Sequence, residues 1–161
     1  MSPGCNVEVL TPDFRGNKFA LSKVLNANPE IYSHNVECVE RISKKVRTQA
    51  NWNTSLDVLK YSVESGLKTK TGIMVGLGET FMEVIETMKQ IVDVGVSIFT
   101  IGQYLQPTKN HLKVKEYVSK EQFEAYKDYG YSIGFKVVES GPLVRSSYHA
   151  DEQARMVFNN D

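Results

Sequence analysis

The sequence contains little cysteine. Cys5 and Cys38 are the two cysteines among 161 residues, and 32 residues separate them. There is no C-x-x-C pair and no similar ligand spacing, so this chain alone is not expected to build a cysteine-ligated cluster or a structural zinc site. Cys38 lies among apolar residues at helical spacing and is expected to be a small buried hydrophobe.

The sequence also lacks an excess of charge and a long apolar run. Lysine plus arginine equals aspartate plus glutamate, at 19 each, which argues against nucleic acid as a partner. No apolar run approaches the roughly 20 residues that span a bilayer. The first residues lack the basic and hydrophobic regions of a signal peptide. We therefore expect no membrane association and a cytoplasmic location.

What is present is an alternation of two patterns over a chain that is 41% hydrophobic. Short runs rich in β-branched and apolar residues predict strands at 7–10, 30–33, 72–75, 96–101 and 135–138. Apolar residues at helical spacing predict helices at 18–27, 39–46, 53–65, 80–94 and 119–130, and the last dozen residues are expected to be frayed. The alternation predicts an α/β fold with about five parallel strands. Five strands do not close an eight-stranded barrel, so residues 1–161 are expected to form a single incomplete barrel domain.

Unusual polar residues and glycines follow each predicted strand. In order along the chain they are Asp13, then His34, Asn35 and Glu37, then Gly76, Gly78 and Glu79, then Gln103, and finally Arg145, Ser146 and Ser147. In an α/β barrel these positions surround one mouth and carry the chemistry. The sequence therefore predicts that the five loops converge.

Individual loops leave alternatives open. The Gly-Leu-Gly-Glu stretch at 76–79 is either a ligand-facing loop or a glycine-permitted turn whose Glu79 favours the positive end of the next helix. His34 and Asn35 either contact a ligand or cap the following helix. Ser146, Ser147 and His149 raise the thought of a Ser–His hydrolase, but no G-x-S-x-G elbow is present. A serine oxygen can also bind a metal, and a plain C-terminal turn is the simplest interpretation.

Taken together, five segments resemble one family. They are Val-Leu-Thr-Pro-Asp-Phe at 9–14, Ser-His-Asn-Val-Glu at 33–37, Met-Val-Gly-Leu-Gly-Glu-Thr at 74–80, Thr-Ile-Gly-Gln-Tyr-Leu-Gln-Pro at 100–107 and Gly-Pro-Leu-Val-Arg-Ser-Ser-Tyr-His-Ala at 141–150. In order and spacing they resemble lipoyl synthase, a member of the radical S-adenosylmethionine (SAM) superfamily. The Arg-Ser-Ser-Tyr ending argues against a sulfur inserter of the biotin synthase kind.

The resemblance implies a partial α/β barrel that inserts two sulfur atoms, at C6 and C8 of an octanoyl chain. The octanoyl group is carried on a lysine of a lipoyl carrier domain or H protein, and an electron donor is needed. Two [4Fe-4S] clusters and SAM are the implied cofactors. By position, Ser147, with Ser146 as the alternate and Arg145 as its supporting neighbour, resembles the serine ligand of the auxiliary cluster within a C-terminal segment, 140–161.

The resemblance also implies the SAM contacts. The loop with Gly76, Gly78 and Glu79 resembles the nucleoside-side contact. Asn35, Glu37 and Gln103 are implied mouth residues for SAM or the octanoyl-lysine substrate.

The chain departs from the family in its cysteines. Lipoyl synthases carry three cysteines for the SAM cluster and three for the auxiliary cluster, and neither set is present here. We therefore expect the chain to correspond to the C-terminal half and to be inactive alone. The alternative is a non-catalytic βα unit with residual nucleoside or partner binding. Unpaired strand edges predict self-association.

Overall fold

The fold is one parallel sheet with its strands in sequence order. The computed structural model describes residues 5–158. Its strands are β1 (Glu8–Leu10), β2 (Ile31–Ser33), β3 (Lys68–Val75), β4 (Ile98–Gln103) and β5 (Val137–Gly141). Each strand pairs in parallel with the next, in the order β1-β2-β3-β4-β5. This confirms the predicted α/β fold with five parallel strands, as expected for part of a barrel.

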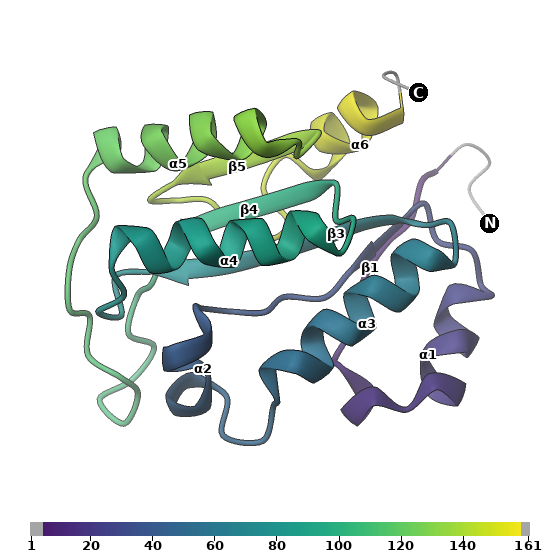
Figure 1. Cartoon of the computed structure of the whole chain (residues 1–161), viewed down its shortest axis with the longest axis horizontal. Coiled ribbons are helices and arrows are strands. Elements are labelled where there is room, and N and C mark those ends of the chain that lie inside the picture. The colour runs from purple at the N-terminus through teal and green to yellow at the C-terminus, as the bar shows by residue number, and fades with distance from the viewer. Residues whose placement is uncertain (1–4, 159–161) are drawn as a thin grey trace.

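Five helices accompany the crossovers between strands, and a sixth follows the last strand. They are α1 (Lys18–Leu25), α2 (Glu40–Val46), α3 (Trp52–Glu64), α4 (Phe81–Asp93), α5 (Lys120–Ile133) and α6 (Ala150–Phe158). Figure 1 shows α3 and α4 in front of the sheet, covering one of its faces. The main core lies beneath this layer and includes Cys38, which is fully buried as expected. Helix α4 begins with the capping box that the Thr-x-x-Glu sequence at 80–83 predicts, since Thr80 and Glu83 exchange side-chain and backbone hydrogen bonds.

Several element boundaries differ from the predicted ones, and two of the differences have an identifiable reason. β3 begins at Lys68 rather than at 72. The prediction missed its first half because several polar side chains there are buried within the sheet. Among them Lys70 is fully buried and its Nζ lies 3.0 Å from Glu8 Oε1 on β1. Such residues give no apolar pattern. Helix α3 begins at Trp52 rather than at 53, because Asn51 accepts a hydrogen bond from the Thr54 backbone N–H and caps the helix.

The C-terminal segment is a helix, so the prediction of a frayed end is wrong for residues 150–158. Ala154 and Val157 of α6 pack against Ile31, Ile98 and Val137. These strand residues point to the face opposite the α3–α4 layer, since Phe99, the neighbour of Ile98, belongs to the main core. The available signal was the helical spacing of Ala150, Ala154 and Val157 within a stretch that is otherwise mostly polar. Residues 159–161 lie outside the described part of the chain.

The sheet is open. β1 and β5 are its two outermost strands in the described chain, and each has a partner on one side. Leu10 on β1 is 57% exposed. An open edge of this kind presents unpaired backbone groups to a further strand.

The packing of α6 on the inner face of the sheet, the face opposite the α3–α4 layer, can be tested with two adjacent residues. Val157 is fully buried, whereas Met156 is 46% exposed. We expect Val157→Ala to lower the free energy of unfolding by about 1–2.5 kcal/mol, from lost burial and the cavity left behind. Met156→Ala should change it by less than about 0.5 kcal/mol. Urea unfolding measures both, and equal effects would contradict the packing described.

Candidate functional site

A small cavity lies at the carboxyl ends of the central strands, on the inner face of the sheet. Its volume is about 110 Å³. The residues that line it are Asn35, Glu37, Gly72, Ile73, Met74, Thr100, Gly102, Val144, Arg145 and Ser146. The cavity therefore brings together four of the residues singled out from the sequence, which come from two distant segments of the chain.

An extra residue after β2 turns Asn35 and Glu37 toward this cavity. The His34 N–H donates to the Lys70 carbonyl and the Glu37 N–H donates to the Gly72 carbonyl, so three residues on one side span two on the other. The Val36 N–H between them donates to Thr71 Oγ1 at 3.3 Å. This is the geometry of a β-bulge, which re-aims side chains next to functional sites. Glu37 has φ +73°, the left-handed region that non-glycine residues rarely adopt.

The two side chains that the bulge presents are electrostatically unusual. Asn35 Oδ1 is buried and has no hydrogen-bond partner in the described chain. Burial raises the pKa of Glu37, while the charge of Arg47 and a hydrogen bond from Asn35 oppose that shift. The alternative that His34 and Asn35 cap the following helix is wrong, because Val39 occupies the N-cap of α2 and no side chain makes a cap hydrogen bond there. A buried acceptor without a donor is a place for a donor group of a ligand.

Two strand glycines leave space for the cavity and for the segment 141–146 beside it. A Cβ on Gly102 would lie far inside contact distance of the Val144 carbonyl oxygen, and one on Gly72 would collide with Thr100 Oγ1. The segment 141–146 therefore lies directly on β4. Sequence reasoning missed Gly72, Thr100 and Gly102. A glycine inside a strand, which marks close backbone approach, was the available signal.

The Gly76–Glu79 loop closes on itself. Gly76 and Gly78 have φ +97° and +102°, conformations that favour glycine. The Glu79 carboxylate accepts hydrogen bonds from the backbone N–H groups of Gly76 and of Leu77, the latter at 3.0 Å. Glu79 thus satisfies two backbone N–H groups of its own loop. The loop does not line the cavity, and its proposed SAM contact stays a prediction.

Gln103 supports the connection that follows β4. Its Nε2 lies within 3.2 Å of the carbonyl oxygens of Val75, Tyr104 and Glu116. Its Oε1 accepts from the Val118 N–H at 2.9 Å. The side chain is 3% exposed. In this geometry Gln103 holds residues 104–118 against the strand ends and is not directed at the cavity.

The two serines occupy different environments. Ser146 is half-buried and lines the cavity, whereas Ser147 is exposed and does not. Arg145 Nη1 donates to the Val144 carbonyl at 2.6 Å. The geometry favours Ser146 over Ser147 as the hydroxyl that faces the cavity. His149 Nδ1 lies 3.0 Å from Glu152 Oε2, a pairing that gives a Ser–His hydrolase no support.

The donor set for a metal is sparse. Among residues 5–158, no group of three or more His, Cys, Asp or Glu side chains is arranged to hold a metal ion. Cys38 is buried, and burial raises the pKa of its thiol to about 12, which disfavours the thiolate that binds iron. A four-cysteine cluster therefore does not fit the described residues.

An arginine on α2 braces the glycine loop from outside. Arg41 Nη2 donates to the Gly78 carbonyl at 2.9 Å, and Arg41 Nε lies 2.5 Å from Glu83 Oε1 at the start of α4. The hydrogen bond from Arg41 and that from the Thr80 backbone lower the pKa of Glu83 to about 2. The pair is solvent-exposed, so its energetic contribution is screened.

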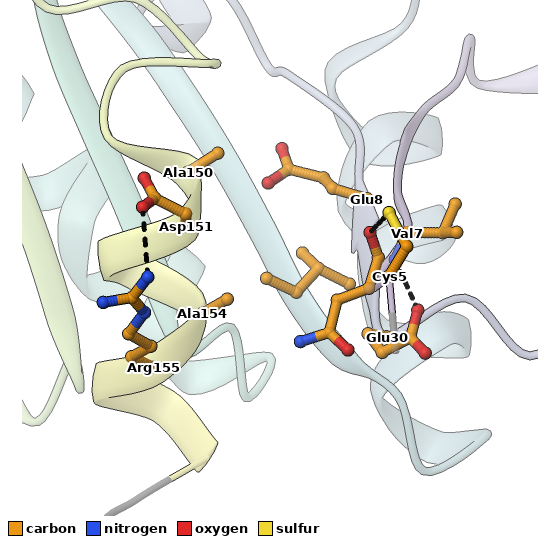
Figure 2. Close-up of a pocket in the computed structure, with 10 residues that line it drawn as sticks. Cys5, Val7, Glu8, Glu30, Ala150, Asp151, Ala154 and Arg155 are labelled. Carbon is orange, nitrogen blue, oxygen red and sulfur yellow. Dashed lines mark hydrogen bonds and ion pairs between the residues drawn. The ribbon is translucent and has the colours of Figure 1, made fainter. Parts of the chain in front are cut away.

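A larger cavity lies elsewhere. It has a volume of about 470 Å³ and lies between α6 and the start of β1 (Figure 2). Figure 2 shows Asp151 and Arg155 paired along α6. Glu8 on β1 and Glu30, directly before β2, lie across the cavity from them. This cavity lies at the amino-terminal side of the sheet, away from the strand ends that carry chemistry in α/β barrels. It marks the open edge of the sheet.

The close approach at Gly102 gives a matched test. We expect Gly102→Ala to push segment 141–146 off β4, to destabilise the fold by about 1–3 kcal/mol and to increase amide exchange across 141–148. Gly141→Ala is the control, because its Cβ would meet Val144 Cγ2 at an ordinary 3.5 Å. Hydrogen exchange read by mass spectrometry distinguishes them; a similar response of the two variants would argue against the tight contact.

The Arg41–Glu83 pair predicts a pH dependence. Because the pKa of Glu83 is lowered in the folded state, its contribution to stability is present above about pH 4.5 and is lost as the pH falls through about 2. We expect Glu83→Gln to flatten the fall of the urea midpoint between these pH values. Glu86→Gln, on the same exposed helix face, should leave the fall unchanged. Identical pH profiles for wild type and Glu83→Gln would contradict the prediction.

Comparison with known proteins identifies the superfamily. A family model described as the Radical SAM superfamily matches residues 1–91. Lipoyl synthase from Bacteroides fragilis is 54% identical over 160 residues, covering 99% of this chain and 55% of that protein. Lipoyl synthase from Flavobacterium psychrophilum is 54% identical over 153 residues, covering 94% of this chain and 53% of that protein. The chain thus spans about half the length of the curated relatives it matches.

A solved structure supports the fold independently of sequence. The crystal structure of SuiB from Streptococcus suis superimposes with a TM-score of 0.66 at 12% identity, covering 90% of this chain and 34% of that one. At that identity the likeness concerns the fold alone. On the family match, the lipoyl synthase relatives and the strand-end site, we conclude that this chain belongs to the radical SAM superfamily and resembles one half of a lipoyl synthase.

Proposed function

We propose that the chain supplies one half of the active site of a lipoyl synthase, which inserts two sulfur atoms into a protein-bound octanoyl-lysine. The observation that carries the proposal is the cavity at the strand ends. It gathers Asn35 and Glu37 from one family-like segment and Arg145 and Ser146 from another, more than 100 residues away. Sequence identity of 54% across almost the whole chain supports the same assignment.

The size of the cavity supports half a site rather than a whole one. Pockets for small ligands usually enclose about 300–1,000 Å³. At about 110 Å³, this cavity takes one part of a molecule as large as SAM. The unpartnered Asn35 Oδ1 and the Glu37 carboxylate offer acceptors to a hydroxyl or ammonium group. The opposite wall then comes from the part of the relatives that this chain does not match.

The described residues fit SAM in part and do not fit a cysteine-ligated cluster. When bound, SAM would supply a carbon-centred radical, and the residues of the cavity would orient part of the SAM molecule. A serine hydroxyl, Ser147 or its alternate Ser146, would supply one oxygen ligand to the auxiliary cluster, beside Arg145. An alkoxide is a poorer iron ligand than a thiolate and would hold such a cluster less firmly. Alone, the chain is inactive because the cluster cysteines are absent.

A rival assignment is a non-catalytic βα unit that binds a nucleoside or another chain. The open β1 edge and the 470 Å³ cavity beside it favour the association that this rival requires. The same edge accepts the complementary half in the first proposal, so both predict a complex or self-association. Activity of that complex separates them.

The protein substrate and the location follow from the first proposal. The partners are an octanoylated lipoyl carrier domain or H protein and an electron donor, in the cytoplasm. Neither a nucleic acid nor a membrane takes part in the proposed reaction. In the part of the chain that the structure describes, none of the helices has the length and apolar character needed to cross a bilayer.

The decisive experiment restores the missing half. The chain is co-expressed with a polypeptide covering the unmatched part of a relative, in a bacterial host that lacks lipoyl synthase. We expect mass spectrometry to detect the lipoylated carrier. Ser147→Ala or Ser146→Ala should reduce it at least about tenfold, depending on which serine is the ligand.

An exposed serine provides the control for that experiment. Ser65→Ala, at the end of α3 and remote in sequence from both segments, should leave lipoylation unchanged. A soluble complex of the two polypeptides that produces no lipoylated carrier would favour the non-catalytic rival.

A further inference from the structure

A buried polar chain lies behind the cavity, between β2 and α3. His34 and Ser55 are 2% and 1% exposed. His34 Nδ1 lies 2.9 Å from the Thr11 carbonyl oxygen, and His34 Nε2 lies 3.0 Å from Ser55 Oγ. Arg47, which follows α2, donates from Nη1 to the same Ser55 Oγ at 3.1 Å. The four groups form one continuous path of hydrogen bonds.

The direction of this path follows from what each group can donate. A carbonyl oxygen only accepts, so the imidazole proton resides on Nδ1 of His34 and points to Thr11. Arginine only donates, so Ser55 Oγ accepts from Arg47 and its own hydroxyl proton points to Nε2. Every member is then satisfied with a neutral imidazole. Burial, the largest cause, lowers the pKa of His34; the hydrogen bond to Thr11 and the charge of Asp13 oppose this shift, and the charge of Arg47 adds to it.

The same arginine holds the loops that follow two strands. Its Nη1 also donates to the Asn35 carbonyl at 3.2 Å, and its Nη2 lies 3.7 Å from Asp13 Oδ2 in the loop after β1. The Arg47 side chain is 20% exposed. Figure 1 shows α2, the helix that precedes Arg47, at the side of the molecule where α3 and α4 begin. Arg47 therefore ties the loop after β1 and the bulge after β2 to α3.

The bulge requires contacts of this kind to keep its conformation. It contains an extra residue that the strand ladder does not pair, and Glu37 adopts a left-handed conformation that is unfavourable for its side chain. An unpaired stretch with a strained residue relaxes unless surrounding contacts determine it. The contact at the Asn35 carbonyl acts on the backbone of the residue whose side chain faces the cavity.

We propose that Arg47 is a positioning residue, acting through Ser55 and His34 to fix the Asn35–Glu37 bulge in the conformation that presents both side chains to the ligand. The positioning role of Arg47 deepens the proposed function, and it rests on that function only in taking SAM as the ligand. Arg47 itself lies outside the cavity and is not among the residues that line it. Its role is to keep the wall of the site in one arrangement.

The test compares Arg47→Gln with Arg47→Lys and Ser55→Ala in the full chain, with Lys45→Gln as the charge-matched control on α2. In wild type, nitrogen-15 NMR should show His34 neutral with its proton on Nδ1. We expect Arg47→Gln and Ser55→Ala to shift the Nε2 resonance, and amide exchange at Val36 and Glu37 to rise at least about tenfold. Arg47→Lys should restore part of the protection, because one ammonium replaces a forked donor. Lys45→Gln should alter neither signal.

The outcomes are separable. Unchanged exchange at Val36 and Glu37, despite an altered His34 signal, would overturn the positioning role. If Arg47→Gln unfolds globally, amide exchange in Ser55→Ala decides the outcome instead, because that variant removes a single hydroxyl. Titration with SAM is carried out on the complex of this chain with the complementary half, and it should show weaker binding by Arg47→Gln than by wild type. If wild type binds no SAM, the ligand assignment of the proposed function fails, while the exchange data still decide whether Arg47 positions the bulge.

Discussion

The parallel pairing of β3 with β4 is the constraint on which the rest of the structure depends. It is the most extended pairing in the sheet, running from Lys70–Ile98 to Val75–Gln103. Parallel pairing places the carboxyl ends of both strands at one edge, so the loops that follow must emerge side by side. The glycine loop, the bulge after β2 and the segment after β5 are all positioned relative to these two strands.

Close backbone approach then turns that edge into a site. Gly72 and Gly102 remove side chains from the inner face, where a Cβ would strike Thr100 or the Val144 carbonyl. The space they leave is partly covered by residues 144–146 and partly open as the cavity. Where a barrel strand usually contributes a bulky residue to the interior, these strands contribute backbone. This geometry suits a ligand that must lie against the sheet.

The residues around the site divide into those that face the cavity and those that hold it. Asn35, Glu37 and Ser146 face it. Glu79 uses its carboxylate on backbone groups of its own loop, and Gln103 uses its amide on backbone groups of β3 and of the connection after β4. The sequence could not distinguish these roles, because a polar residue after a strand is compatible with either. The difference depends on which backbone groups lie within reach, and that is decided by the path of residues 104–118.

The sequence by itself determined the alternation of strands and helices, the buried Cys38 and the capping box of α4, because these depend on local periodicity and on neighbours a few residues apart. It also determined the family resemblance, which depends on order and spacing. Only the tertiary structure decided that α6 packs on the inner face, that Ser146 rather than Ser147 lines the cavity, and that Arg47 reaches Asn35. These contacts join residues whose sequence pattern is polar or weak, and their partners are chosen by the geometry of the folded sheet.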